Sequence, residues 1–80
     1  MEPLQILNGL LKQPTFYRRT IAHLDEEYFD DPAHQLIVNK IKSYSGEFRK
    51  QASPSDIRLM IQNDMDLTDK ETEQGIASVN

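Results

Sequence analysis

Leucines recur at helical spacing near the start of this chain, and prolines break the pattern into short segments. The leucines at positions 4, 7, 10 and 11 repeat every three or four residues, which indicates the apolar face of a helix. Pro14 disfavours a helical conformation in the residue before it, so the first helix should occupy about residues 3–12. Gly9 weakens the middle of that helix, and a close contact with another helix would explain its presence.

The second expected helix begins at Pro14 and ends at an acidic corner, residues 25–27. Its inner face carries three apolar residues, with Phe16 beside them: Tyr17, Ile21 and Leu24. Arg18 and Arg19 should then point toward solvent or toward a partner. Proline at the first helical position is compatible with this start, because the N–H that it lacks would have no partner there.

Two aromatic residues, Tyr28 and Phe29, follow the acidic corner. We expect them to plug the corner into the core. Because they are adjacent, they cannot both face inward equally, and one that stays exposed would be a plausible interface anchor.

The third helix is the longest one expected, from about residue 32 to residue 44 or 48. Asp30 or Asp31 should cap it, with Pro32 at its first position. Gly46 either ends this helix or lies near its close. One apolar stripe runs along the helix: His34, Ile37, Ile41, Tyr44 and Phe48.

Two further helices are expected after a loop at residues 51–55. Ser53 or Ser55 can cap the first of them, whose apolar residues are Ile57, Leu59, Met60 and Ile61. Thr68 and Glu71 match the capping box, so the fifth helix should start near residue 69. The sequence ends before that helix has a stop signal, which suggests truncation from a longer chain.

Length and composition favour one small soluble domain, residues 1–80. No segment alternates apolar and polar residues over the length of a strand, so we predict an all-α bundle of about five short helices. The chain lacks cysteine, which is compatible with a reducing cytoplasm. No apolar run approaches the roughly 20 residues of a membrane span, so we expect no membrane partner. A net charge of −4 predicts little or no direct nucleic-acid binding.

Residues suited to catalysis or to cofactor binding do not form a recognisable motif. His23 and His34 have no further zinc ligands at suitable spacing, and His34 should be a packed residue. The acids of residues 25–31 lack the central glycine of a calcium loop. None of the glycines, at positions 9, 46 and 75, precedes a Lys-Ser or Lys-Thr pair, so no phosphate loop is present. We therefore predict no catalytic, cofactor-binding or metal-binding residue, and no enzymatic activity in this chain.

Several short motifs resemble, in order and spacing, the start of DnaB-type replicative DNA helicases. They are the Leu-Leu-Lys-Gln-Pro step that ends at Pro14, the Leu-Asp-Glu-Glu-Tyr-Phe step that ends at Phe29, His34-Gln-Leu-Ile with Ile41, and Ser55-Asp-Ile. The similarity is greatest to the short versions in tailed phages, including the T-even group. The resemblance implies an N-terminal collar domain that supports hexamer assembly and docks primase or a helicase loader. Its partners would be other helicase subunits, in the cytoplasm of the host cell.

The same resemblance places ATP and Mg²⁺ in a motor domain outside these residues, so this chain would hold no cofactor. As partner-binding residues we predict Phe16, Arg18, Arg19 and Tyr28. Two other hypotheses stay open. The chain could be the helicase-binding domain of a primase or another helical adaptor, or it could be a small DNA-binding regulator. The link between the third and fourth helices is too long and too polar for a tight helix-turn-helix, which disfavours the last hypothesis.

Overall fold

The computed structural model describes residues 3–79, and their side chains from Gln5 onward, so the side chain of Leu4 lies outside the described residues. Over residues 3–79 the chain forms five α-helices, two single-turn 3₁₀ helices and no strand, which confirms the predicted all-α bundle. In chain order these elements are α1 (Pro3–Lys12), α2 (Pro14–Thr20), η1 (Ile21–His23), η2 (Glu26–Tyr28), α3 (Pro32–Phe48), α4 (Pro54–Gln62) and α5 (Asp69–Val79).

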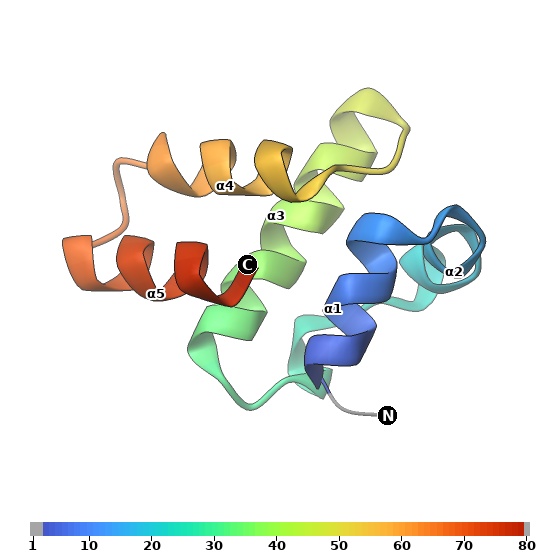
Figure 1. The fold of residues 1–80 in the computed structure, drawn as a ribbon, viewed down its shortest axis with the longest axis horizontal. Coiled ribbons are helices and arrows are strands. Elements are labelled where there is room, and N and C mark those ends of the chain that lie inside the picture. The colour runs from blue at the N-terminus through green and yellow to red at the C-terminus, as the bar shows by residue number, and fades with distance from the viewer. Residues whose placement is uncertain (1–2, 80) are drawn as a thin grey trace.

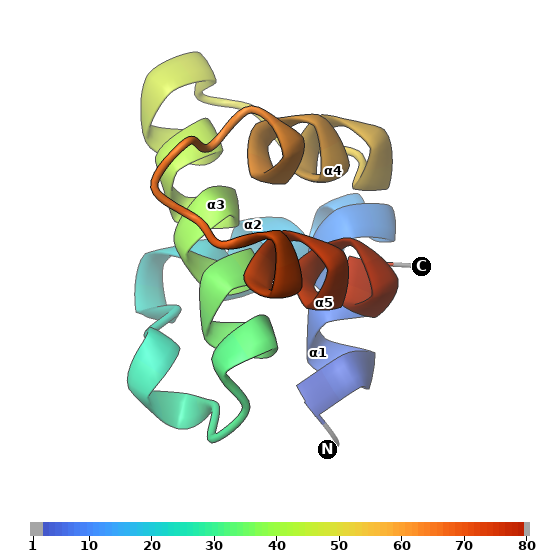
Figure 2. The same cartoon turned by 90° about the vertical axis from the view of Figure 1, so that its left-hand side faces the viewer.

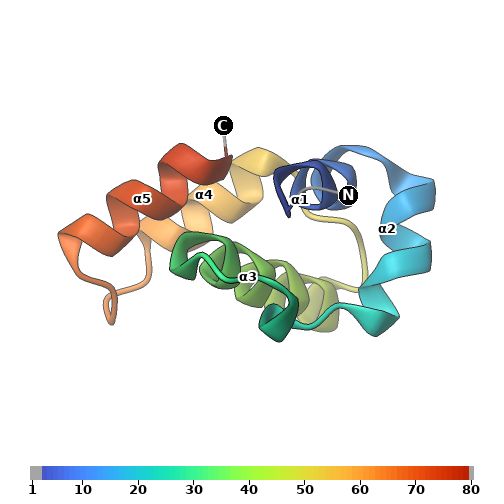
Figure 3. The ribbon, with the colours of Figure 1, turned by 90° about the horizontal axis from the view of Figure 1, so that it is seen from below.

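The longest helix, α3, organises the bundle (Figure 1). It packs against α1 near one end of the molecule and against α4 and α5 near the other. Figures 2 and 3 show α1, α4 and α5 over the same side of α3, with α2 beyond α1. The opposite side of α3 is left to solvent, in agreement with the exposed side chains of Asn39, Lys42 and Ser43.

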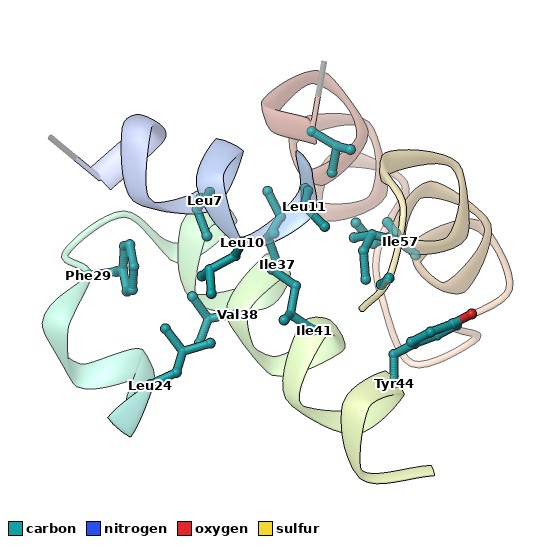
Figure 4. Close-up of a cluster of buried hydrophobic side chains, with 13 residues drawn as sticks. Leu7, Leu10, Leu11, Leu24, Phe29, Ile37, Val38, Ile41, Tyr44 and Ile57 are labelled. Carbon is teal, nitrogen blue, oxygen red and sulfur yellow. The ribbon is translucent and has the colours of Figure 1, made fainter. Parts of the chain in front are cut away.

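The core forms where these helices meet (Figure 4). Ile37 and Ile41 lie one turn apart on α3, and both are buried, as the sequence predicts. Around them pack buried residues from four other segments: Leu7, Leu10 and Leu11 of α1, Leu24 and Phe29 of the corner, Ile57 and Ile61 of α4, and Val79 of α5.

Side-chain caps begin three of the helices at or next to the predicted positions. Asp31 accepts a hydrogen bond from the N–H of Ala33 at the start of α3. Ser53 and Asp56 form a reciprocal capping box on α4, and Thr68 forms the same box on α5 with Glu71. Each cap satisfies backbone N–H groups that lack partners inside the helix.

The first glycine lies at a close contact between two helices, as we expected. A Cβ atom placed on Gly9 would lie 2.7 Å from Cδ1 of Phe16, which belongs to α2. Glycine therefore lets α1 and α2 approach each other across the break at Pro14.

The second helix is shorter than predicted. It ends at Thr20, and the chain continues as the 3₁₀ turn η1. Leu24 then has an extended backbone, although its side chain is buried. Thr20 and Ile21 are β-branched and favour a helix only weakly, so burial of Leu24 against α3 outweighs continuation of α2.

The aromatic corner buries one of its two rings and leaves the other exposed. Phe29 is 2% exposed and enters the core, but Tyr28 is 74% exposed. Tyr28 ends the 3₁₀ turn η2 and Phe29 follows it with an extended backbone, so the two adjacent side chains point in different directions. Only one of the two rings can therefore face α3.

The last turn of α3 corrects one expectation and meets another. Phe48 belongs to the predicted apolar stripe, yet it is 53% exposed. Gly46 lies near the close of the helix, which is one of the two alternatives that the sequence predicts, and Arg49 caps the end with a left-handed backbone at φ 55° and ψ 38°. Phe48 stays exposed because α3 extends past the helices that cover its earlier turns.

Candidate docking surface

The four predicted partner-binding residues lie on two separate elements. Phe16, Arg18 and Arg19 belong to α2, which packs on α1, whereas Tyr28 belongs to η2, which packs on α3. Arg18, Arg19 and Tyr28 are exposed as predicted. Phe16 is half-buried against the core and Gly9, so much of its ring serves packing.

No hydrogen bond, ion pair or ring contact joins Tyr28 to the other three within the described part of the chain. The neighbouring Tyr17 is buried, and its hydroxyl pairs with the Ser45 hydroxyl to tie α2 to α3. The structure therefore shows no direct interaction between Tyr28 and the three residues of α2.

A larger candidate surface lies elsewhere, between α3 and α4. An open groove of about 640 Å³ runs between these helices. Its apolar lining consists of Tyr44, Phe48, Leu59 and Met60, and we call it the α3–α4 groove. Phe48 and Leu59 are 53% and 56% exposed, so both offer much of their apolar surface to a ligand.

Packing around the groove holds its aromatic residues in place. The rings of Tyr44 and Phe48 have centroids 4.6 Å apart and planes tilted by 44°. Tyr44 is itself buried, and Met60 packs against the same core. The contact with the buried Tyr44 restricts the Phe48 ring, so less side-chain entropy is lost when Phe48 contacts a partner.

Charged side chains border this apolar lining. Lys40 donates a hydrogen bond to Asp64, and this ion pair links α3 to the segment after α4. The bond from Lys40, with a second from the backbone N–H of Asp66, holds the pKa of Asp64 below its ordinary value of 3.8. Asp64 is therefore ionised at neutral pH.

A second carboxylate, Asp56, lines the groove at the start of α4. The N–H of Ser53 donates to it in the capping box, and this bond is the main cause that lowers the pKa of Asp56. The hydroxyls of Ser53 and Tyr44 and the positive charge of Lys50 lower it further, while partial burial opposes them. Asp56 thus brings a stable negative charge to the groove while it caps the helix.

A smaller crevice of about 370 Å³ lies where α1, α3 and α5 meet. His34, Asn8 and Ser78 supply its polar groups, above a floor that includes Leu7 and Leu11. His34 packs edge-on against the ring of Phe29, 6.4 Å between centroids, as expected for a packed histidine. The apolar floor of this crevice is buried, so it offers less apolar surface than the α3–α4 groove.

Sequence reasoning missed the groove, although one signal was present. Leu59 lies about 200° around the helix from Ile57 and about as far from Ile61. It cannot share their buried face, so its exposure could have been foreseen. The exposure of Phe48 could not, because Phe48 has the same angular position as the buried Ile41.

The described part of the chain holds neither a cluster of metal ligands nor a membrane-spanning helix. Residues 3–79 contain no group of three or more histidine, aspartate or glutamate side chains placed to hold a metal ion. No helix in the same range is both long and apolar enough to cross a membrane.

Comparison with known proteins adds no relative. No family model, curated protein or solved structure matches this chain. The resemblance to DnaB-type helicases stays a prediction from the sequence.

Proposed function

We propose that this chain is the N-terminal assembly and partner-docking domain of a DnaB-type replicative DNA helicase. One observation of the structure supports the docking role: a groove of about 640 Å³ between α3 and α4 exposes Phe48 and Leu59. Aromatic and large apolar side chains on a rigid surface are typical anchors of protein interfaces. The order and spacing of the motifs at Pro14, Phe29 and His34 support the helicase assignment.

In this proposal the domain has no catalytic role and acts by binding other proteins. It places neighbouring subunits relative to one another and offers a surface to primase or to a helicase loader. ATP hydrolysis belongs to a motor domain outside these residues.

Binding to primase and to the loader encoded by the same genome tests the docking role. We expect the purified chain to bind one of them with a micromolar dissociation constant in isothermal titration calorimetry. Leu59→Glu should abolish the heat of binding, because it places a charge in the apolar lining. Met65→Glu is the matched control, since it places the same charge on an exposed apolar residue outside the groove lining. Absence of binding to both proteins would contradict the proposal.

The gene on both sides of these 80 codons tests the helicase assignment separately. A phosphate loop about one domain downstream would support it. A zinc ribbon and a polymerase core upstream would assign the chain to a primase instead. If both features are absent from the gene, the chain would be an independent adaptor.

A further inference from the structure

The α3–α4 groove has the form of a site for one additional helix. On α3 its lining residues are spaced by four, three and one, at positions 40, 44, 47 and 48. On α4 they lie at 56, 59 and 60, and Asn63, which caps the end of α4, continues the row. Each row follows one face of its helix over about two turns, or roughly 11 Å. Two such rows with apolar residues between them form a groove of the kind that binds the apolar face of an amphipathic partner helix.

The charges around the groove favour a basic occupant. Among the side chains that line it, three are carboxylates, Glu47, Asp56 and Asp64, and only one is a cation, Lys40. Lys40 is already paired with Asp64. Glu47 makes no ion pair among the described residues, and Lys50 lies close enough to Asp56 to act on it. Because three of the four charged lining residues are carboxylates, the border around Phe48 and Leu59 is negative on balance.

We propose that the α3–α4 groove binds a short amphipathic helix of a partner protein, with apolar anchors spaced three and four residues apart and Lys or Arg beside them. The apolar anchors would contact Phe48, Leu59 and Met60. The basic residues would face Glu47 and Asp56, which orients the helix and speeds association. This inference rests on the docking role proposed above, and it does not depend on membership in the helicase family.

A selection experiment tests the chemistry of the occupant. The probe is a displayed library of helical peptides of about 16 residues, with three leucines at helical spacing. Every other exposed position is randomised equally among Lys, Arg, Asp, Glu, Gln and Ala. Selection against the full chain should enrich net basic peptides. Enrichment of acidic or neutral peptides, or no enrichment above the bare support, would overturn the proposal.

Variants then locate the binding site. With an enriched peptide, Leu59→Glu should weaken affinity by at least about tenfold. Glu47→Lys should weaken affinity less, by about three- to tenfold. Added salt should reduce the difference in affinity between this variant and the parent protein, because salt screens exposed charges. The controls are Met65→Ala and Glu73→Lys, which change an exposed apolar residue and an exposed helical glutamate outside the groove lining. Equal losses in variants and controls would overturn the assignment to the groove.

Two further outcomes separate this inference from the alternatives. A dimer in sedimentation that Leu59→Glu dissociates would assign the groove to a second copy of the chain and overturn the inference. Basic helices that bind the groove, together with failure to bind primase and loader, would uphold the inference and reject those two partners. Thermal unfolding followed by circular dichroism confirms that each variant is folded.

Discussion

Two residues near the end of α3 hold backbone conformations for which other residue types are better suited. Gly46 is helical and a Cβ placed on it meets nothing within 4 Å, while Arg49 has a positive φ of 55°. Glycine loses more conformational freedom in a helix than alanine does. A non-glycine residue in the left-handed region carries a steric cost. Neither residue is therefore optimal for stability.

Gly46→Ala should stabilise the protein by about 0.5–1 kcal/mol, because it restricts the unfolded chain at no steric cost in the helix. Urea unfolding measures the change. Gly9→Ala is the matched control, since the same substitution would bring its Cβ to 2.7 Å from the Phe16 ring and should lose this gain. Destabilisation by Gly46→Ala would mean that the last turn of α3 is not helical in solution.

Asp64 should make stability dependent on pH in the acid range. Its pKa is lowered in the folded state, so its contribution is complete above its ordinary value of 3.8 and is lost as the pH falls through the lower folded value. Asp64→Asn should therefore destabilise the protein at pH 7, and the difference from the parent should shrink toward pH 3 and below. Urea unfolding across this range measures it. A difference that is constant with pH would show that the ion pair with Lys40 contributes nothing.

Among the elements, α3 takes part in more of the tertiary packing than any other helix. Its buried face meets α1, α4 and α5, so one helix connects both parts of the bundle. The other helices are short and depend on this contact, because isolated helices of fewer than about 12–15 residues are marginal in water.

Ile41→Ala should cost about 2–5 kcal/mol, because it leaves a cavity in the centre of α3's buried face. For so small a domain this is a large share of the total stability. Thermal unfolding should show a much lower midpoint. Lys42→Ala, at the next and exposed position, should change the midpoint little. An unchanged midpoint in Ile41→Ala would mean that this stripe does not form the core.

At the scale of the whole molecule, the chain is compact for its length. The radius of gyration is 11.5 Å, which agrees with the value of about 12 Å expected for a folded domain of this size. The exposed large apolar residues are few: Tyr28, Phe48, Leu59 and Met65. Two of these belong to one groove, which makes that groove the main apolar feature of the described surface.

We expect the isolated chain to be mainly monomeric at micromolar concentration. The α3–α4 groove spans only about two helical turns, whereas a stable interface buries about 1,200–2,000 Å² in total. Sedimentation velocity over a tenfold range of concentration measures the association state. A stable dimer or hexamer at low micromolar concentration would show that these residues contain a complete assembly surface.

The fold class and the starts of most helices could be predicted from the sequence, because local interactions decide them. The break at Pro14, the caps at Asp31, Ser53 and Thr68, and the burial of Ile37 and Ile41 each depend on residues a few positions apart. Backbone sterics, capping and helical periodicity act at that range. Composition and motifs add a hypothesis of function, which the docking experiments above test.

Only the tertiary structure decides which residues of one predicted apolar face stay exposed. Phe48 and Ile41 share one face of α3, yet α4 and α5 cover only the earlier turns, so Phe48 borders a groove. Tyr28 and Phe29 are adjacent, and the direction of one 3₁₀ turn decides that Phe29 enters the core. Exposure depends on where distant segments pack, and local sequence patterns do not contain that information. The sequence indicates possible anchors on α2 and η2 by residue type alone. The α3–α4 groove forms only when the two helices pack together.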